Sequence, residues 1–219
     1  MNTYAEENYL KALFNIGNEK GEVTVQELSN QLNIKCPSVN SMVKKLAEKK
    51  LVHYESYKPL RLTDKGKKEA GLIIRKHRLT EMYLVDKMGF GWEQVHEIAE
   101  QVEHLQSPLF FDKIDELLGF PKLDPHGSPI PDKHGKIQWV EYTKLSDHKA
   151  GDKIKLSAVT HSSDEFLKFL NSRGMHLGII VNVLSTETFD GSMTVSYGKK
   201  IKETLSKTIT EKLLTEKAR

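Results

Sequence analysis

The sequence predicts a mainly α-helical protein followed by a small β domain. Three observations support this fold class. Apolar residues recur at helical spacing through residues 1–119. A stretch with four prolines, FPKLDPHGSPIPDKHG, then interrupts the pattern. After it, KIKLSAV, LGIIVNVL and SMTVSYG read as short strands, with the helix SSDEFLKFLNSRG between the first two. We expect helical domains at 1–63 and 64–135 and a small barrel at 136–219.

Two capping boxes mark the first helices. Thr3 with Glu6, and Thr24 with Glu27, have the spacing at which each side chain bonds the backbone N–H of the other residue. The first helix is expected to end near Gly17. The second helix, VQELSNQL, leads after a short turn into NIKCPSVNSMVKKLAEKKL, which predicts a helix-turn-helix.

The segment that follows, LVHYESYKPLRLT, reads as two short strands, the wing of a winged helix. Residues 35–68 carry ten Lys and Arg against three Asp and Glu, a balance that suits a polyanion. A generic helical domain with a basic surface is the alternative, but the order of the elements favours double-stranded DNA. The residues expected at the DNA are Pro37, Ser38, Asn40, Ser41, Lys44, Lys45 and Arg61.

Three further helices are predicted before the proline-rich stretch. The first is long, from about Asp64 to Lys87, and a Gly-Phe-Gly sequence separates it from a second at 92–107. The third, PLFFDKIDELLG, carries more apolar side chains than one short helix can hide, so they belong to the core or to a dimer contact. We expect the dimer, because helix-turn-helix repressors usually read paired half-sites.

The helix at 92–107 has a stripe of possible metal ligands. At about 100° per residue, four side chains fall within roughly a quarter turn: His96, Glu100, Glu103 and His104. Crowding them on one stripe is costly unless a positive charge lies among them, and a divalent metal would supply it. The alternative is a solvated acidic face. A second pair at helical spacing, His77 and Glu81, favours metal binding.

Composition limits the remaining possibilities. A single cysteine, Cys36, excludes an intramolecular disulfide framework and fits a reducing compartment. No apolar leader and no apolar run of membrane length are present, so we expect a cytoplasmic protein that does not bind a membrane. Five further histidines have no partner at metal-binding spacing: His53, His126, His134, His148 and His176.

Four segments of the chain resemble a known family. EENYLKALF, RKHRLTEMYL, VHEIAEQVEHLQS and DPHGSPIP are similar to segments of the diphtheria-toxin-repressor family of metal-dependent repressors, which includes the manganese transport regulators. The resemblance covers nearly the whole chain. It implies a winged helix-turn-helix, a helical dimerisation domain and, as in the longer members, an SH3-like C-terminal barrel.

The resemblance also implies a primary metal site made of Asn8, Glu100, Glu103 and His104. At the first position, iron-type members have Met and manganese-type members have Asp. At the position of Glu100, they have Cys and Glu, respectively. Asn8 matches neither group, although an amide oxygen can ligate. A site of oxygen and imidazole ligands suits Mn²⁺, with Fe²⁺ as the alternative.

A second site is implied as well, giving two ions per subunit. The short manganese regulators have a carboxylate where this chain has Lys11, which cannot ligate when charged. The longer members use two His, one Glu and groups from the C-terminal domain. The matching positions are His77, Glu81 and His96, with Glu165 and His161 as C-terminal candidates.

We therefore expect a cytoplasmic homodimer that represses metal-homeostasis genes when Mn²⁺ or Fe²⁺ binds, on a palindromic operator. Two alternatives remain: a metallohydrolase that uses the Glu/His cluster on a water, and a winged-helix regulator that senses an organic ligand. No further nucleophile or general-base motif accompanies the cluster, so an enzyme is not expected.

Overall fold

The structure is a computed structural model that describes residues 2–160 and 163–218. The chain forms two compact units. Unit 1 comprises Met1–Tyr83, Glu97–Lys122 and Ile130–Gln138, and unit 2 comprises Leu84–His96, Leu123–Pro129 and Trp139–Arg219. The predicted fold class, helical domains followed by a β-rich domain, is confirmed. Among the described residues, no helix combines the length and apolarity that a bilayer span requires.

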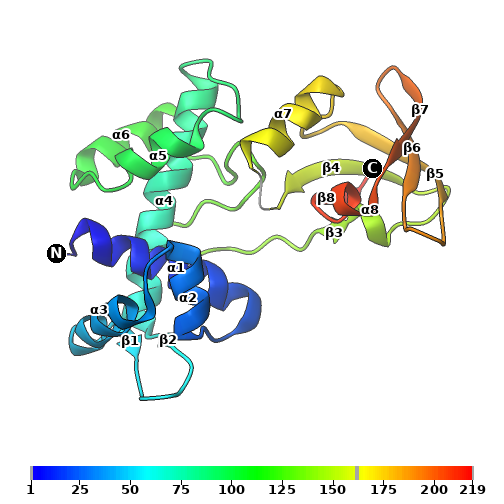
Figure 1. The fold of residues 1–219 in the computed structure, drawn as a ribbon. Helices are drawn as coiled ribbons and strands as arrows, with labels where there is room; N and C mark the ends of the chain where they lie inside the picture. Colours follow the sequence, from blue (N-terminus) through cyan, green and yellow to red (C-terminus); the bar gives the residue numbers. More distant parts are fainter. Residues whose placement is uncertain (1, 161–162, 219) are drawn as a thin grey trace. The chain divides into compact units, whose positions relative to one another are not determined.

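Unit 1 begins with the predicted helix-turn-helix (Figure 1). Its helices are α1 (Tyr4–Lys20), α2 (Val25–Leu32) and α3 (Cys36–Glu48). Both predicted capping boxes are present. The first helix runs one turn beyond the predicted end at Gly17 and stops at Gly21, whose φ of 81° suits a residue without a Cβ.

The wing is a short antiparallel pair, β1 (Val52–His53) with β2 (Arg61–Leu62), as predicted. A single apolar core joins it to the three helices. The core buries side chains from α1, α2, α3 and the wing, among them Leu10, Leu13, Leu28, Val39, Val43, Leu46 and Leu60. The core fixes which face of α3 points away from the unit.

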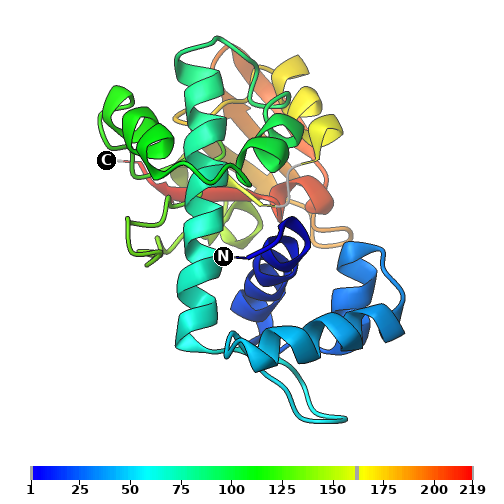
Figure 2. The same ribbon diagram turned by 90° about the vertical axis from the view of Figure 1, so that its left-hand side faces the viewer.

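The next helices are α4 (Asp64–Asp86), α5 (His96–Val102) and α6 (Pro108–Leu117). Figure 2 shows α4 as one unbroken helix. The prediction of a helix over 92–107 is wrong in length. The Gly91 N–H donates to the Gln94 side chain at 2.8 Å, and the Gln94 N–H donates to the Gly91 carbonyl at 2.9 Å, so a local turn replaces the first helical turn.

The apolar side chains of α6 divide between two environments. Phe111 and Ile114 are buried with Leu79 of α4. Leu109 and Leu117 are 71% and 59% exposed, and Phe110 and Phe120 are also exposed. The described residues therefore leave these apolar side chains of the segment uncovered.

The proline-rich stretch is irregular, as predicted, and part of it packs on α4. A Cβ on Gly71 would lie 2.0 Å from the carbonyl oxygen of Gly135, so the two backbones touch without a side chain between them. The Arg75 guanidinium donates to the Pro131 carbonyl at 2.7 Å and pairs with the Asp115 carboxylate of α6. These contacts fix α4, α6 and residues 130–138 as one body.

Unit 2 is built on an antiparallel sheet with strand order β3-β8-β4-β5-β6-β7. The strands are β3 (Thr143–Lys144), β4 (Lys153–Val159), β5 (Ile180–Thr186), β6 (Met193–Tyr197), β7 (Lys200–Leu205) and β8 (Leu213–Lys217). It also contains η1 (Leu145–Asp147), α7 (Asp164–Ser172) and α8 (Lys207–Thr210). The sequence predicts β4, α7, β5 and β6 but not the remaining elements.

Candidate metal centre and DNA-reading surface

Lys11 of α1 lies between two carboxylates of the predicted primary site. Its Nζ donates to Glu100 Oε1 at 2.6 Å and to Glu103 Oε1 at 2.7 Å. The Lys11 side chain is 14% exposed, and that of Glu103 is completely buried. A buried carboxylate requires a nearby positive charge, and here the ammonium group supplies it.

His77 of α4 connects this centre to a further carboxylate, that of Glu81. Its Nδ1 lies 2.6 Å from Glu103 Oε2, and its Nε2 lies 3.0 Å from Glu81 Oε1. Burial alone would lower the pKa of His77, but the hydrogen bonds with Glu103 and Glu81 outweigh it and raise the pKa to about 9. Burial would raise the pKa of Glu103, yet His77 and Lys11 together lower it. Two basic side chains, Lys11 and His77, therefore contact one buried carboxylate.

His104 contacts α1 through a residue that the sequence analysis missed. Its Nδ1 lies 2.6 Å from Glu7 Oε2, and Gln106 Nε2 donates to the other Glu7 oxygen at 2.9 Å. The Tyr4 and His104 rings lie 3.9 Å apart. Glu7 stands four residues before Lys11, so both project from the same face of α1 toward the centre. This spacing was the signal available in the sequence.

Two polar atoms of the expected ligand set are buried without a hydrogen-bond partner among the described residues. They are Asn8 Oδ1 and His104 Nε2, the latter 3.5 Å from Glu103 Oε1. Leaving such atoms unpaired costs about 1–3 kcal/mol each. A divalent ion accepts lone pairs from an amide oxygen and an imidazole nitrogen, so the donor atoms present fit a metal of the Mn²⁺ or Fe²⁺ type.

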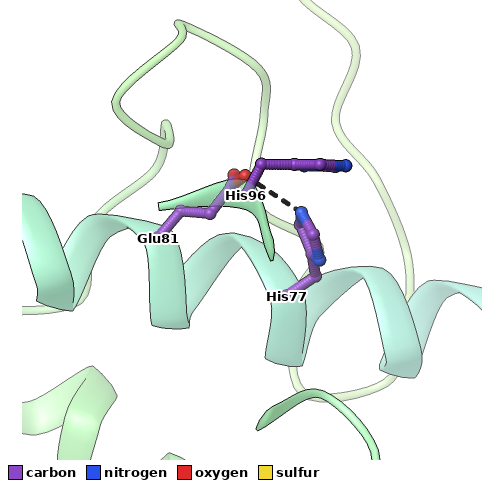
Figure 3. A group of neighbouring side chains, drawn as sticks. All are labelled: His77, Glu81 and His96. Carbon is purple, nitrogen blue, oxygen red and sulfur yellow. Dashed lines mark hydrogen bonds and ion pairs between the residues drawn. The ribbon is translucent and has the colours of Figure 1, made fainter. Parts of the chain in front are cut away.

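Three of the residues expected to bind the second ion lie close to one another. Figure 3 shows His77 and Glu81 one turn apart on α4, joined by the hydrogen bond, with the ring of His96 beside them. One ligand atom from each of the three lies within 4.8 Å of the others. Ligand atoms of His77, Glu100 and Glu103 lie equally close together, so His77 can join either the second-site residues or the two carboxylates of the primary site.

The two C-terminal candidates belong to unit 2. Glu165 is exposed in the first turn of α7, where hydrogen bonds with its own backbone N–H and Ser163 lower its pKa. His161 lies outside the described residues.

The predicted DNA-contacting residues lie on α3 and the wing. Pro37, Ser38, Ser41, Lys44 and Lys45 are exposed, and Asn40 is half-buried. The Ser41 hydroxyl donates to the Pro37 carbonyl at 3.1 Å, so its oxygen can still accept from a base. Arg61 forms an ion pair with Glu22 at 2.8 Å. A DNA phosphate that binds Arg61 would have to share this guanidinium with the Glu22 carboxylate or displace that carboxylate.

Glu6 of α1 contacts Lys45 of α3 and Lys49, the residue that caps the end of α3. Lys49 Nζ donates to its Oε2 at 2.7 Å, and Lys45 Nζ lies 3.2 Å from its Oε1. Burial would raise the pKa of Glu6, but bonds from Lys49, the Thr3 N–H and Lys45 lower it to about 2. The sequence predicts Lys45 at DNA and Glu6 in the capping box, but it does not predict the contact between them. A charged group on α1 therefore contacts the helix predicted to read DNA.

Three domain families match the chain in succession. Residues 1–60 match the N-terminal DNA binding domain of iron dependent repressors, and residues 63–132 match their metal binding and dimerisation domain. Residues 143–217 match the FeoA domain.

Individual relatives and a solved structure are similar to the chain over the same domains. The iron-dependent repressor IdeR of Mycobacterium tuberculosis is 32% identical over 125 residues, 57% of this chain and 54% of IdeR. The alignment thus spans about half of that relative. The regulator MntR of Oceanobacillus iheyensis is 32% identical over 124 residues, which cover 57% of this chain and 84% of MntR. A solved manganese-dependent transcriptional repressor in complex with manganese superposes with a TM-score of 0.87, at 27% identity, covering 97% of this chain and 99% of that one.

A winged helix-turn-helix, a helical domain with a carboxylate–imidazole centre and a small β domain define the class of metal-dependent transcriptional repressors. The chain belongs to the diphtheria toxin repressor family within that class. Members of this family are repressors and not enzymes, so the metallohydrolase alternative is set aside.

Proposed function

We propose that this chain represses transcription by binding an operator as a homodimer when Mn²⁺ binds, with Fe²⁺ as the alternative ion. One observation carries the proposal. The residues of a single turn of α1 face both functional regions: Glu6 holds α3, while Glu7 contacts His104. A change at the centre therefore acts on the helix that also positions the DNA-reading helix.

Asn8, Glu100, Glu103 and His104 would hold the primary ion. Asn8 Oδ1 and His104 Nε2, which lack a hydrogen-bond partner in the described part of the chain, support that assignment. The ion would offset the negative charge of the carboxylates and accept lone pairs from the amide oxygen and the imidazole nitrogen. The protein's part is to assemble these donors from α1 and from residues 100–104. Only the arrangement of α1 in which all donors meet gains this free energy, so binding selects that arrangement.

His77, Glu81 and His96 would hold a second ion, with Glu165 and His161 as C-terminal candidates. The proximity of the first three supports this site. Because each ring nitrogen of His77 faces a different carboxylate, occupation of one site would alter the other.

The DNA-reading residues would be Pro37, Ser38, Asn40 and Ser41 at base edges, with Lys44, Lys45 and Arg61 at phosphates. The uncovered apolar face of α6 supports a homodimer, and two copies would suit a palindromic operator. The boundaries near 63 and 135 would separate DNA reading, metal binding with dimerisation, and the β domain. A repressor acts at the chromosome, so we place it in the cytoplasm.

The test is a metal titration of DNA affinity. A duplex would be selected from random sequence with Mn²⁺ present. Fluorescence anisotropy would then give its affinity at buffered free Mn²⁺, Zn²⁺ and, without oxygen, Fe²⁺. We expect the affinity to rise with Mn²⁺ or Fe²⁺ in their physiological range. An affinity that no metal changes would contradict the proposal and favour an organic effector.

A further inference from the structure

Lys11 makes contacts that a metal ion would otherwise make. Its ammonium group reaches one oxygen of Glu100 and one of Glu103, at 2.6 and 2.7 Å. These are the two carboxylates assigned to the primary ion. The cluster therefore has its own cation, carried on a flexible side chain of the same protein.

We propose that Lys11 is a tethered competitor of the metal: it neutralises Glu100 and Glu103 in the metal-free protein and must give up at least one of these contacts before the ion is fully bound. This inference rests on the proposed metal-dependent function. Lys11 would thereby set the metal concentration at which the protein responds.

The burial of the contact supports competition. Glu103 is completely buried, and its second oxygen already faces His77, so Oε1 is the oxygen left for a further ligand bond. Lys11 binds that same atom. A hydrogen bond to a charged group contributes about 1.5–3 kcal/mol, so its loss would shift metal affinity by roughly tenfold to hundredfold.

The unpaired atoms support it independently. Asn8 Oδ1 is an acceptor, and so is His104 Nε2 in the tautomer whose Nδ1–H donates to Glu7. An ammonium could satisfy either atom, yet neither has a hydrogen-bond partner within the described chain. Lys11 thus forms hydrogen bonds with the two carboxylates but leaves the amide oxygen and the imidazole nitrogen without one. A divalent ion would satisfy both kinds, so the competition is one that the ion can win.

The test compares wild type with Lys11→Met, which keeps most of the length of the side chain and removes its charge. The matched control is Lys20→Met, also on α1, whose lysine pairs with Glu27 away from the centre. Isothermal calorimetry would measure Mn²⁺ affinity, and thermal unfolding would measure the stability of the metal-free and Mn²⁺-loaded protein.

We expect Lys11→Met to bind Mn²⁺ roughly tenfold to hundredfold more tightly at one site. It should also have a lower unfolding temperature without metal and a larger rise with Mn²⁺. The control should change neither affinity nor the metal-dependent rise. Lys11→Gln provides the same test should the Met variant fold poorly.

Unchanged or weaker Mn²⁺ affinity in a folded Lys11→Met or Lys11→Gln protein would overturn the inference and leave the proposed function standing. If neither the wild type nor the variants bound Mn²⁺ or Fe²⁺, the proposed function itself would fail. The two failures are therefore distinguishable.

Discussion

Glu6 of α1 and Lys49, at the C-terminal cap of α3, are joined by a hydrogen bond of 2.7 Å, with the lysine Nζ as donor and the buried carboxylate as acceptor. Lys45 of α3 adds a second ion pair to the same carboxylate. The next residue along α1, Glu7, contacts His104. One turn of α1 therefore joins the candidate metal centre to the helix predicted to read DNA.

Glu6→Gln should loosen this connection. Gln can still accept from the Thr3 N–H, so the capping box is kept while the charge is lost. Lys45 and Lys49 then become available to phosphates, and we expect tighter metal-free DNA binding with a salt slope steeper by up to about 2. The ratio of affinities with and without Mn²⁺ should fall.

Anisotropy titrations over a range of salt concentrations measure both quantities. Glu27→Gln is the control, because Glu27 has the same capping role on α2 and pairs with Lys20 instead. An unchanged slope in the Glu6 variant would mean that these lysines do not reach DNA.

Replacing Arg61 should weaken binding to all duplexes alike. Its guanidinium pairs with Glu22 on the wing side and would contact a phosphate in the complex. We expect Arg61→Ala to reduce the salt slope by about 1, whereas Ser38→Ala should weaken the selected duplex more than random DNA. Competition with random duplex separates the two effects. A sequence-selective loss at Arg61 would refute the phosphate role.

Substitution of His77 should affect both proposed metal sites. Its Nδ1 faces Glu103 and its Nε2 faces Glu81. We therefore expect His77→Ala to weaken both Mn²⁺-binding events seen by calorimetry, while Glu81→Gln weakens only one. Loss of an outer partner that holds a metal ligand, as His77 holds Glu103, typically reduces metal affinity by about 10–100-fold. Equal effects of the two variants on both events would argue against separate sites.

The sequence predicted the elements whose pattern is local. Capping boxes, the helix-turn-helix, the wing and α4 depend on spacing along the chain, and they were found as predicted. The helix at 92–107 was predicted too long because a Gly91–Gln94 turn competes with its start. β7 and β8 are rich in charged residues, and they become strands by pairing with β6 and β4.

The contacts within the candidate site were less predictable. Spacing placed Glu100, Glu103 and His104 on one stripe, but it could not show that Lys11 or Glu7 reaches them. These contacts join residues about ninety positions apart, and only the packing of unit 1 brings them together.

Gly71 should not tolerate a side chain. Its Cβ would fall 2.0 Å from the Gly135 carbonyl oxygen, so α4 or residues 130–138 would have to move. We expect Gly71→Ala to destabilise the protein by about 1–3 kcal/mol in chemical denaturation. The control, Gly17→Ala in α1, places its Cβ 3.5 Å from Val23 and should instead stabilise by up to about 1 kcal/mol. The same sign for both would contradict the close approach.

The most direct test of metal-controlled DNA binding is operator affinity with and without Mn²⁺ for wild type and His104→Ala. His104 Nε2 has no hydrogen-bond partner among the described residues, and the apolar residues that pack α5, such as Val95 and Ala99, are untouched by the substitution. His134→Ala, at an exposed histidine, is the control. We expect a folded His104→Ala protein whose DNA affinity no longer responds to Mn²⁺, beside a control that responds like wild type. A folded His104→Ala protein that keeps the full metal response would contradict the assignment of the primary site.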